Sequence, residues 1–357
     1  MKVWCSSASS AVQKSNTVAI TFEAKQSAAM QQWFEHMWWS KRRKPNIGLR
    51  LLSRIYKKVM LYDQNKRFQT QVCPSIPMIS VGNITVGGSG KTPFVVWLAG
   101  ELKAQGFNPV LLSRGDGANN QEPHVVSQYS KAREVGDEAV LLYRLSGCPV
   151  IAGRDRIKGA EMAAKYGDVL ILDDGFQYRQ LHRVCDIVLV PKEGVGNGYL
   201  LPAGPLREPV SALARADVVV RTGHGGFEPL TDAKEWDWSA KAAGVVDWMG
   251  VQGMPLGVDS KVTLVTSVAR PRRVRNDLET LGFEVMNHEI FDDHHAYTQD
   301  VVAKLMKGNQ TIVTTGKDAV KLLPLWDNSK PLWVLEQKAE AEEGLLASVL
   351  AFVNVMG

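Results

Sequence analysis

From about residue 75 onward, short apolar runs alternate with segments whose apolar residues recur at helical spacing. The runs predict buried strands, because they are short and rich in Val, Ile and Leu. Strands are predicted at 77–81, 109–113, 169–172, 187–190, 218–221, 261–266, 284–289 and 311–314. Predicted helices include 93–102, 272–281 and 299–307. This alternation is typical of parallel sheets that helices cover on both faces.

The alternation is interrupted near residues 223–238, which contain Gly, Trp and Asp without a clear period. We interpret this stretch as a junction between two units. The prediction is therefore an α/β fold of two α/β/α lobes, the first with the parallel sheet of a P-loop NTPase, preceded by an amphipathic helix. The predicted domains are residues 46–240 and 241–357, after an amino-terminal segment of residues 1–45.

Between Ile47 and Lys66, apolar residues recur at helical spacing and basic residues fall largely between them. The apolar positions are Leu51, Leu52, Ile55, Tyr56, Val59 and Met60, and the basic positions are Arg50, Arg54, Lys57 and Lys58. Tryptophans lie upstream at Trp33, Trp38 and Trp39. A basic amphipathic helix with nearby indoles suits the headgroup layer of a membrane. Docking on its own domain is the alternative, and both can hold along different parts of the helix.

Charge is distributed unevenly along the chain. Residues 1–67 hold thirteen Lys or Arg against three acidic residues, a net charge of +10, whereas the whole chain carries +5. A basic arm on a mildly acidic body indicates an anionic surface as partner. The first 30 residues or so are rich in Ser and Ala, which fits an organellar transit peptide or a disordered tail.

The composition, with 45% hydrophobic and 22% charged residues, is ordinary for a soluble globular protein. No run of 18 apolar residues occurs, so we expect no helix to span a bilayer. Cys5, Cys73, Cys148 and Cys185 lie far apart and form no CxxC pair. They indicate reduced thiols rather than a zinc site or a disulfide framework.

The stretch ISVGNITVGGSGKTPFVVWLA, from Ile79 to Ala99, combines a buried strand, a glycine-rich turn and a helix start. Backbone N–H groups of such a loop close around phosphate oxygens. We assign phosphate binding to Thr85, Val86, Gly87, Gly88, Ser89, Gly90, Lys91 and Thr92. Lys91 would contact the β- and γ-phosphates, and the Thr92 hydroxyl would ligate Mg²⁺. Thr85 stands where a standard Walker loop has glycine, and a plain glycine turn is the alternative.

A second polar cluster follows the strand predicted at 169–172, which ends in Asp173 and Asp174. P-loop enzymes use an aspartate in this place to hold Mg²⁺. Because strand side chains alternate, we expect one of the two to face the metal and the other to cap the next turn.

Two further clusters are ambiguous on their own. Gly136-Asp137-Glu138 stands at an expected helix start, where an amino-terminal cap by Asp137 would account for it. FDDHH, residues 291–295, could hold a metal, form a general-base pair or cap the helix that begins near Thr298. The Gly- and Pro-rich segment 196–209 is unusually apolar for a loop, and such long loops often carry function.

Together these segments resemble the tetraacyldisaccharide 4′-kinase family of lipid A biosynthesis. The resemblance rests on VGNITVGGSGKTP, GDE, AGRDR (152–156), LDDGFQ, LLPAGPLREP, FDDHH and TTGKDAVKL (314–322), which follow the family's order over residues 48–323. Thr85 in the phosphate loop is also the family's form. Tyr178 and Gly316 depart from the pattern, since the family usually has His and Glu at these positions.

The resemblance implies ATP- and Mg²⁺-dependent phosphorylation of the 4′-hydroxyl of a tetraacylated glucosamine disaccharide 1-phosphate. It implies an active site in the cleft between the two lobes, and membrane attachment through the amino-terminal helix. The implied catalytic residues are Asp137, its dyad partner His294 and Lys91; the implied metal site comprises Thr92, Asp173 and Asp174; and Arg207 and Glu208 fall at the hinge. We expect no nucleic-acid partner, and the sequence leaves the oligomeric state open.

A phosphate-loop GTPase or a metal-delivery ATPase is the alternative enzyme class, and a non-catalytic membrane scaffold is a third reading. The segment Gly316–Ala319 faintly resembles a guanine-reading motif but lacks its Asn or Thr. The Ser- and Ala-rich extension favours a plant-type member that is imported into mitochondria and associates with a membrane. A bacterial enzyme would instead lie on the cytoplasmic face of the inner membrane.

Overall fold

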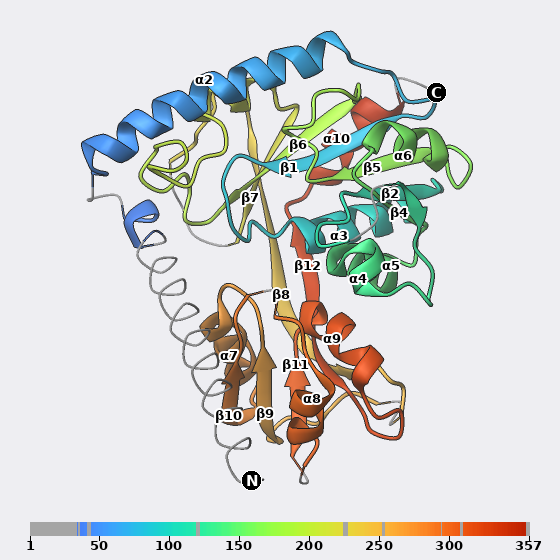
Figure 1. Cartoon of the computed structure of the whole chain (residues 1–357). Helices are drawn as coiled ribbons and strands as arrows, with labels where there is room; N and C mark the ends of the chain where they lie inside the picture. Colours follow the sequence, from blue (N-terminus) through green and yellow to red (C-terminus); the bar gives the residue numbers. More distant parts are fainter. Residues whose placement is uncertain are drawn as a thin grey trace, which may run out of the picture.

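The computed structural model describes residues 34, 36–40, 44–118, 122–223, 228–251, 254–293, 295–307 and 310–354. Across these residues the strands form one mostly parallel sheet in the order β10-β9-β11-β12-β8-β7-β6-β1-β5-β2-β4-β3 (Figure 1). The fold is therefore mixed α/β, as the alternation of apolar runs and helices predicted. All eight predicted strands are present, with ends shifted by at most two residues.

The first set of strands surrounds the predicted phosphate loop. It comprises β1 (Met78–Asn83), β2 (Pro109–Ser113), β3 (His124–Val125), β4 (Val150–Ala152), β5 (Val169–Asp173), β6 (Cys185–Pro191) and β7 (Val218–Thr222). Its helices are α3 (Lys91–Ala104), α4 (Ala132–Val135), α5 (Asp137–Ser146) and α6 (Arg156–Ala163). β1 pairs in parallel with β5 and β6, and its residues are all buried. Burial on both faces explains why β1, β2, β4, β5 and β6 are mostly apolar.

The second set lies beyond residue 260. Its strands are β9 (Lys261–Thr266), β10 (Glu284–Ile290) and β11 (Thr311–Thr314), and its helices are α7 (Pro271–Thr280), α8 (Gln299–Leu305) and α9 (Gly316–Leu322). A 3₁₀ turn, Leu323–Leu325, follows α9, and a 3₁₀ helix, Val210–Arg215, precedes β7 of the first set. The three strands are mutually parallel, and each is followed by a loop or helix on the same edge of the sheet.

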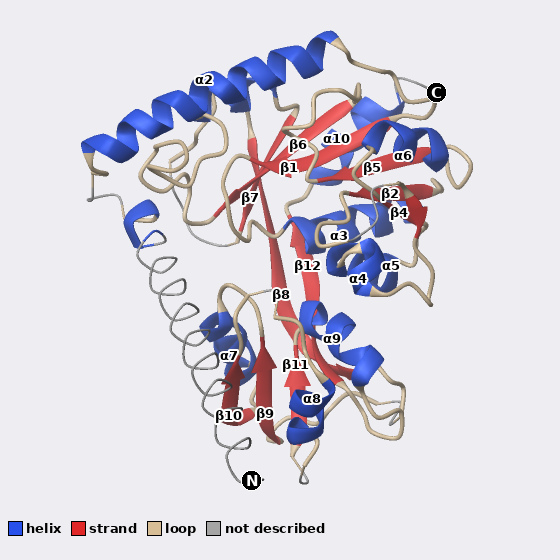
Figure 2. Cartoon of the chain, in the orientation of Figure 1, coloured by secondary structure: helices blue, strands red, loops and turns tan. Residues whose placement is uncertain are grey.

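A long antiparallel ribbon of β8 (Glu235–Asp247) and β12 (Trp333–Ala341) joins the two sets (Figure 2). β8 runs parallel to β7, and β12 runs parallel to β11. Because β8 and β12 are antiparallel, the carboxyl ends of the two strand sets point toward one another. Loops that follow strands in the two sets can therefore meet. Part of the expected junction is regular structure, since residues 235–238 pair with β7 as the start of β8.

The carboxyl-terminal helix α10 (Leu345–Val353) returns to the first set of strands. Leu345, Val349 and Val353 are buried in the same hydrophobic cluster as Ile79 and Leu98. The predicted unit 241–357 therefore shares this helix with the core around the phosphate loop.

Helix α2 (Ile47–Gln69) docks on the body through its less apolar side. Ser53 Oγ donates to the Leu200 carbonyl at 3.0 Å, and Tyr56 OH donates to the Arg207 carbonyl at 3.0 Å. The opposite side is apolar and exposed: Ile47, Leu51, Leu52, Ile55 and Val59 have exposed fractions of 83%, 57%, 51%, 52% and 63%. Among the described residues, no helix has the length and apolar character needed to cross a membrane.

Segment 1–45 is described only at residues 34, 36–40 and 44–45. Met37 is buried, and Trp38 Nε1 donates to the Pro202 carbonyl at 2.9 Å. The Trp38 carbonyl accepts from the backbone N–H of Asn197 at 2.8 Å. This part of the amino-terminal segment thus packs on the loop of residues 196–209.

Gly82 allows β1 to approach the turn after β5. A β-carbon on Gly82 would lie 2.5 Å from the Phe176 Cβ and 2.7 Å from its backbone nitrogen. We expect Gly82→Ala to lower the free energy of unfolding by about 2–3 kcal/mol, because the buried turn must shift. Gly100→Ala in α3 is the matched control: no atom lies within 4 Å, and it should be neutral or gain up to about 1 kcal/mol. Denaturant unfolding measures both, and equal stabilities would contradict this packing.

Candidate active site

The phosphate loop leaves β1 at Asn83 and enters α3 at Lys91. Gly87 and Gly90 have φ angles of 94° and 78°, a left-handed region that favours glycine. No atom would lie within 4 Å of a β-carbon at Gly87 or Gly88, so both residues border open space. Backbone N–H groups here and at the start of α3 can surround an anion. The geometry fits a phosphate loop better than a plain glycine turn.

Neighbouring strands and loops hold this turn in place. Asn83 Nδ2 donates to Ser89 Oγ at 2.9 Å, and Thr222 Oγ1 donates to the Ser89 carbonyl at 2.9 Å. The N–H of Val86 donates to the Pro205 carbonyl at 2.8 Å. Thr85 is buried and forms a β-bridge with Leu206. The loop of residues 196–209 therefore supports the phosphate loop directly, which gives its apolar composition a structural reason.

Asp174 gathers three cations next to the loop. Lys91 Nζ lies 3.2 Å from Asp174 Oδ1, and Arg207 Nη1 lies 3.0 Å from both carboxylate oxygens. Arg156 Nη1 donates to the Asp174 backbone carbonyl at 3.0 Å. Burial opposes ionisation of Asp174, but Lys91, Arg207 and Arg156 hold the pKa of that carboxyl well below its usual range. Lys91 Nζ also contacts Asn83 Oδ1 at 3.3 Å, so its ammonium is held at the loop.

The pKa of Asp173 is shifted in the opposite direction from that of Asp174. Burial, reinforced by the charges of Glu138 and Asp174, raises the pKa of Asp173 to about 7, although Lys91 and Arg156 act to lower it. Its Oδ1 is buried and has no hydrogen-bond partner among the described residues. A buried carboxylate oxygen without a partner, on the strand beside a phosphate loop, suits a hard divalent cation. The residues present therefore fit Mg²⁺, with Asp173 and the Thr92 hydroxyl as the candidate ligands.

Asp137 and Glu138 occupy the first turn of α5. Gly136 is the residue that precedes the helix, so Asp137 is not its capping residue, although its Oδ1 accepts from the Glu138 N–H at 2.9 Å. Lys317 Nζ of α9 reaches Glu138 Oε1 at 3.0 Å. Burial opposes the charge on Lys317, but Glu138 and Asp137 outweigh it and raise the pKa of Lys317. This contact joins the two strand sets at their facing edges.

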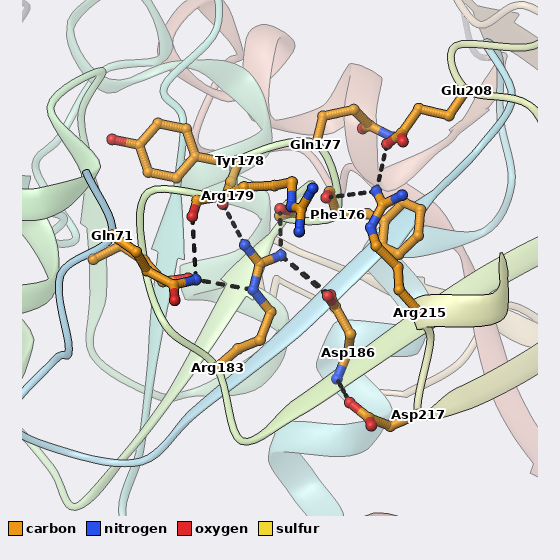
Figure 3. Close-up of polar contacts among 12 residues, drawn as sticks. Gln71, Phe176, Gln177, Tyr178, Arg179, Arg183, Asp186, Glu208, Arg215 and Asp217 are labelled. Atoms are coloured by element: carbon orange, nitrogen blue, oxygen red, sulfur yellow. Dashed lines mark hydrogen bonds and ion pairs between the residues drawn. The ribbon is translucent and has the colours of Figure 1, made fainter. Parts of the chain in front are cut away.

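A polar network holds the turn after β5 from one side (Figure 3). Gln177 Nε2 donates to the Asn83 carbonyl at 2.8 Å and to Glu208 Oε1 at 3.1 Å. Arg215 Nη2 donates to the same Glu208 oxygen at 2.7 Å, and its guanidinium lies 3.9 Å from the Phe176 ring centroid. Glu208 is 1% exposed and accepts from both Gln177 and Arg215, so it anchors the turn.

The other side of the same turn is held by Arg183 (Figure 3). Its guanidinium donates to the carbonyls of Gly175 at 3.2 Å and Tyr178 at 2.5 Å, and pairs with Asp186 at 3.2 Å. Asp217 accepts from the Asp186 N–H at 2.7 Å. The two networks fix the backbone that carries Asp173 and Asp174, while Arg207 and Glu208, expected at a hinge, lie at the turn itself.

Residues 291–293 and 295 of the FDDHH segment follow β10. His294, expected to be catalytic, lies outside the described residues. His295 stacks on Phe291 with ring centroids 4.7 Å apart, and burial together with Lys321 lowers its pKa. The following helix is capped by Thr298, whose side chain accepts from the Val301 N–H. Among the described residues, no group of three or more His, Cys, Asp or Glu could hold a metal ion.

The GKDA segment is not arranged to read a guanine base. Asp318 is fully buried, and its oxygens bind Ser267, Tyr297 and Thr315 within the protein. Its carboxylate is therefore not available to a nucleotide base, which removes the motif that favoured a GTPase. The cysteines described, at positions 73, 148 and 185, are free thiols.

Three residues of the site had no role predicted from the sequence. Asn83 contacts Lys91, Arg156 contacts Asp174, and Lys317 contacts Glu138. Each lies within one of the segments VGN, AGRDR and TGKDA. Nothing in the sequence indicated their partners, since Lys317 and Glu138 are 179 positions apart. The facing carboxyl ends of the two strand sets bring them together.

The chain is similar to known proteins along most of its length. Residues 46–354 match the family model described as tetraacyldisaccharide-1-P 4′-kinase. A tetraacyldisaccharide 4′-kinase of Dechloromonas aromatica is 35% identical over 325 residues, which cover 89% of this chain and 96% of that protein. One from Methylobacillus flagellatus is 35% identical over 339 residues, covering 90% and 94%.

A solved structure is also similar. The crystal structure of LpxK from Aquifex aeolicus in complex with ATP matches with a TM-score of 0.72 and 30% identity, over 85% of this chain and 97% of that one. These matches cover most of this chain and most of each relative. The chain therefore belongs to the tetraacyldisaccharide-1-phosphate 4′-kinase family.

Proposed function

We propose that this chain uses ATP to phosphorylate the 4′-hydroxyl of a tetraacylated glucosamine disaccharide 1-phosphate, a step of lipid A biosynthesis. The observation that carries the proposal is the phosphate loop with Lys91 held between Asn83 and Asp174, in a chain whose family match covers residues 46–354. ATP is the phosphate donor, in keeping with the ATP complex of the similar LpxK structure.

In this account the residues from Thr85 to Thr92 bind the phosphates through backbone N–H groups, and Lys91 stabilises charge that develops on the transferred group. The bond from the γ-phosphorus to the bridging oxygen breaks, the bond to the 4′-oxygen forms, and ADP leaves. Asp137 accepts the hydroxyl proton at a carboxylate oxygen. We retain His294 as the proposed partner of Asp137, on the strength of the FDDHH motif.

Bound Mg²⁺ would neutralise phosphate charge, and Thr92, Asp173 and Asp174 are its proposed ligand set. Asp173 is the stronger candidate of the two aspartates. Its buried Oδ1 has no hydrogen-bond partner in the part of the chain that the structure describes, whereas Asp174 is already paired with Lys91 and Arg207.

Nucleotide turnover tests this function. We expect the purified protein to release ADP from ATP at least about tenfold faster when tetraacyldisaccharide 1-phosphate is present, because the acceptor completes the site. GTP should be a poorer donor. Acceptor-independent turnover, or a preference for GTP, would instead support the GTPase or metal-delivery ATPase.

We propose that α2 binds a membrane surface through its exposed apolar side. The polar side already contacts the protein through Ser53 and Tyr56, which leaves Leu51, Ile55 and Val59 toward solvent. A substrate anchored by acyl chains stays in a membrane, so an enzyme that acts on it must bind there.

Vesicle sedimentation tests this surface. We expect the double substitution Leu51→Glu and Ile55→Glu to weaken binding to phosphatidylglycerol vesicles at least about tenfold, because two apolar side chains lose burial. Met254→Glu with Val258→Glu is the control, since both residues are exposed and lie outside α2. Equal binding of both double variants would contradict a role for α2.

We also propose that the chain is a plant-type member imported into mitochondria. The Ser- and Ala-rich first 30 residues support import. A fluorescent fusion of residues 1–60 that stayed in the cytosol would contradict it.

We propose further that two lobes divide near residue 240, with α10 returning to the first lobe. The separate hydrophobic clusters around β9 and β11 support this division.

A further inference from the structure

Asp318 is a buried carboxylate for which the proposed chemistry has no use. It accepts hydrogen bonds from the Ser267 N–H at 3.0 Å, Tyr297 OH at 3.2 Å and Thr315 Oγ1 at 2.8 Å, and also from Ser267 Oγ. Lys321 Nζ lies 3.2 Å away. A buried charge is costly unless it is paired and hydrogen-bonded. Here the partners come from the segments after β9, β10 and β11, so Asp318 fixes these three loops relative to one another.

The same helix places a lysine against the first strand set. α9 packs closely on α5, because a β-carbon on Gly316 would lie 3.1 Å from Leu141 Cδ1. Lys317 is the next residue, and its Nζ lies 3.0 Å from Glu138 Oε1. Asp318 follows directly in the helix. The residue that organises the three loops is therefore adjacent to the residue that crosses to Glu138.

The Lys317 ammonium stabilises the position of the Glu138 carboxylate, because the other charged neighbours of Glu138 include carboxylates. The charge of Glu138 acts on Asp173, the proposed metal ligand. Lys91 is occupied by Asp174 and Asn83. Without Lys317, repulsion from the adjacent Asp137, and from Asp173 whenever that group is ionised, would favour rotation of Glu138 away from the site.

We propose that Lys317 is a positioning residue for phosphoryl transfer: held by the Asp318 network, it fixes Glu138, and with it the first turn of α5 that carries Asp137, against the phosphate loop. The inference rests on the proposed kinase function. Since a misplacement of about 1 Å can cost about a hundredfold in rate, loss of this contact should appear in kcat.

The test compares Lys317→Met with Lys317→Arg and with Lys241→Met. Lys241 forms a similar ion pair with Glu340, at 2.6 Å, within the β8–β12 ribbon. We expect Lys317→Met to lower kcat about 10- to 100-fold. The dissociation constant for ATP, measured by calorimetry, and the unfolding temperature should stay close to the parent's, because the pair is partly exposed. Lys317→Arg should recover most of the rate, and Lys241→Met should resemble the parent.

A double-mutant cycle separates positioning from a general loss. If Lys317 acts through Glu138, then Lys317→Met should have little further effect on kcat in a Glu138→Gln background. Additive effects, or a Lys317→Met variant within about twofold of an active parent, would overturn the inference alone. A parent that transfers no phosphate would overturn the proposed function and this inference with it.

Discussion

Replacement of Lys91 by methionine is expected to lower kcat/KM for ATP about a thousandfold, since it removes the cation held at the phosphate loop. The ammonium lies between Asn83 Oδ1 and Asp174 Oδ1, close to the residues that border open space. Methionine keeps the length and apolar stem of the side chain but cannot stabilise charge on the transferred phosphoryl group. Transfer of radiolabelled phosphate from ATP to the lipid acceptor measures the effect.

Lys103→Met is the matched control for this substitution. Lys103 lies in the last turn of the same helix, α3, far along the helix from the phosphate loop. Its replacement should leave kcat/KM within about twofold of the parent, as is usual for surface sites. A Lys91→Met variant that kept more than about a tenth of the parent's activity would contradict the role given to the loop.

Asp173→Asn is expected to lower kcat at least about a hundredfold while it stabilises the metal-free protein at neutral pH. Burial, together with Glu138, raises the pKa of Asp173 to about 7, from 3.8 for an ordinary carboxyl. Between these two pH values the folded protein binds more protons than the unfolded chain, so its stability falls as pH rises. Above about pH 7 the Asp173 carboxyl is ionised in both the folded and the unfolded protein, and its destabilising effect has reached its full size.

The stability gained by Asp173→Asn should therefore grow by about 2–3 kcal/mol from pH 5 to pH 8. Unfolding in EDTA without nucleotide measures this difference. Asp232→Asn serves as the control because Asp232 is exposed. A gain that was constant with pH, or that shrank as pH rose, would show that Asp173 is not held against ionisation.

The parallel sheet was predictable because buried strands are continuous apolar runs, and those runs ended within two residues of the observed strands. β8 was missed because its inner and outer residues do not alternate regularly, and β12 because its second half is exposed and charged. These two strands form the ribbon that reverses the second set. Local sequence patterns therefore could not reveal that the carboxyl ends of the two strand sets face each other, although the candidate site depends on this arrangement.

The geometry of the candidate site was predictable where one segment holds all its parts, as in the loop from Thr85 to Thr92. It was not predictable where partners are distant in sequence. Arg207 meets Asp174, and Lys317 meets Glu138, only after the sheet has formed. Local patterns could suggest that Asp137 was a cap, whereas in the structure Gly136 precedes the helix and Asp137 begins it.

Identification of the phosphorylated product is the most direct test of the central claim. The protein would be incubated with ATP, Mg²⁺ and tetraacyldisaccharide 1-phosphate in detergent micelles, and the product examined by mass spectrometry and phosphorus NMR. We predict a single added phosphate at the 4′-oxygen, absent with Lys91→Met. Bound and hydrolysed ATP without any phosphorylated lipid, or a phosphate at another hydroxyl, would contradict the account.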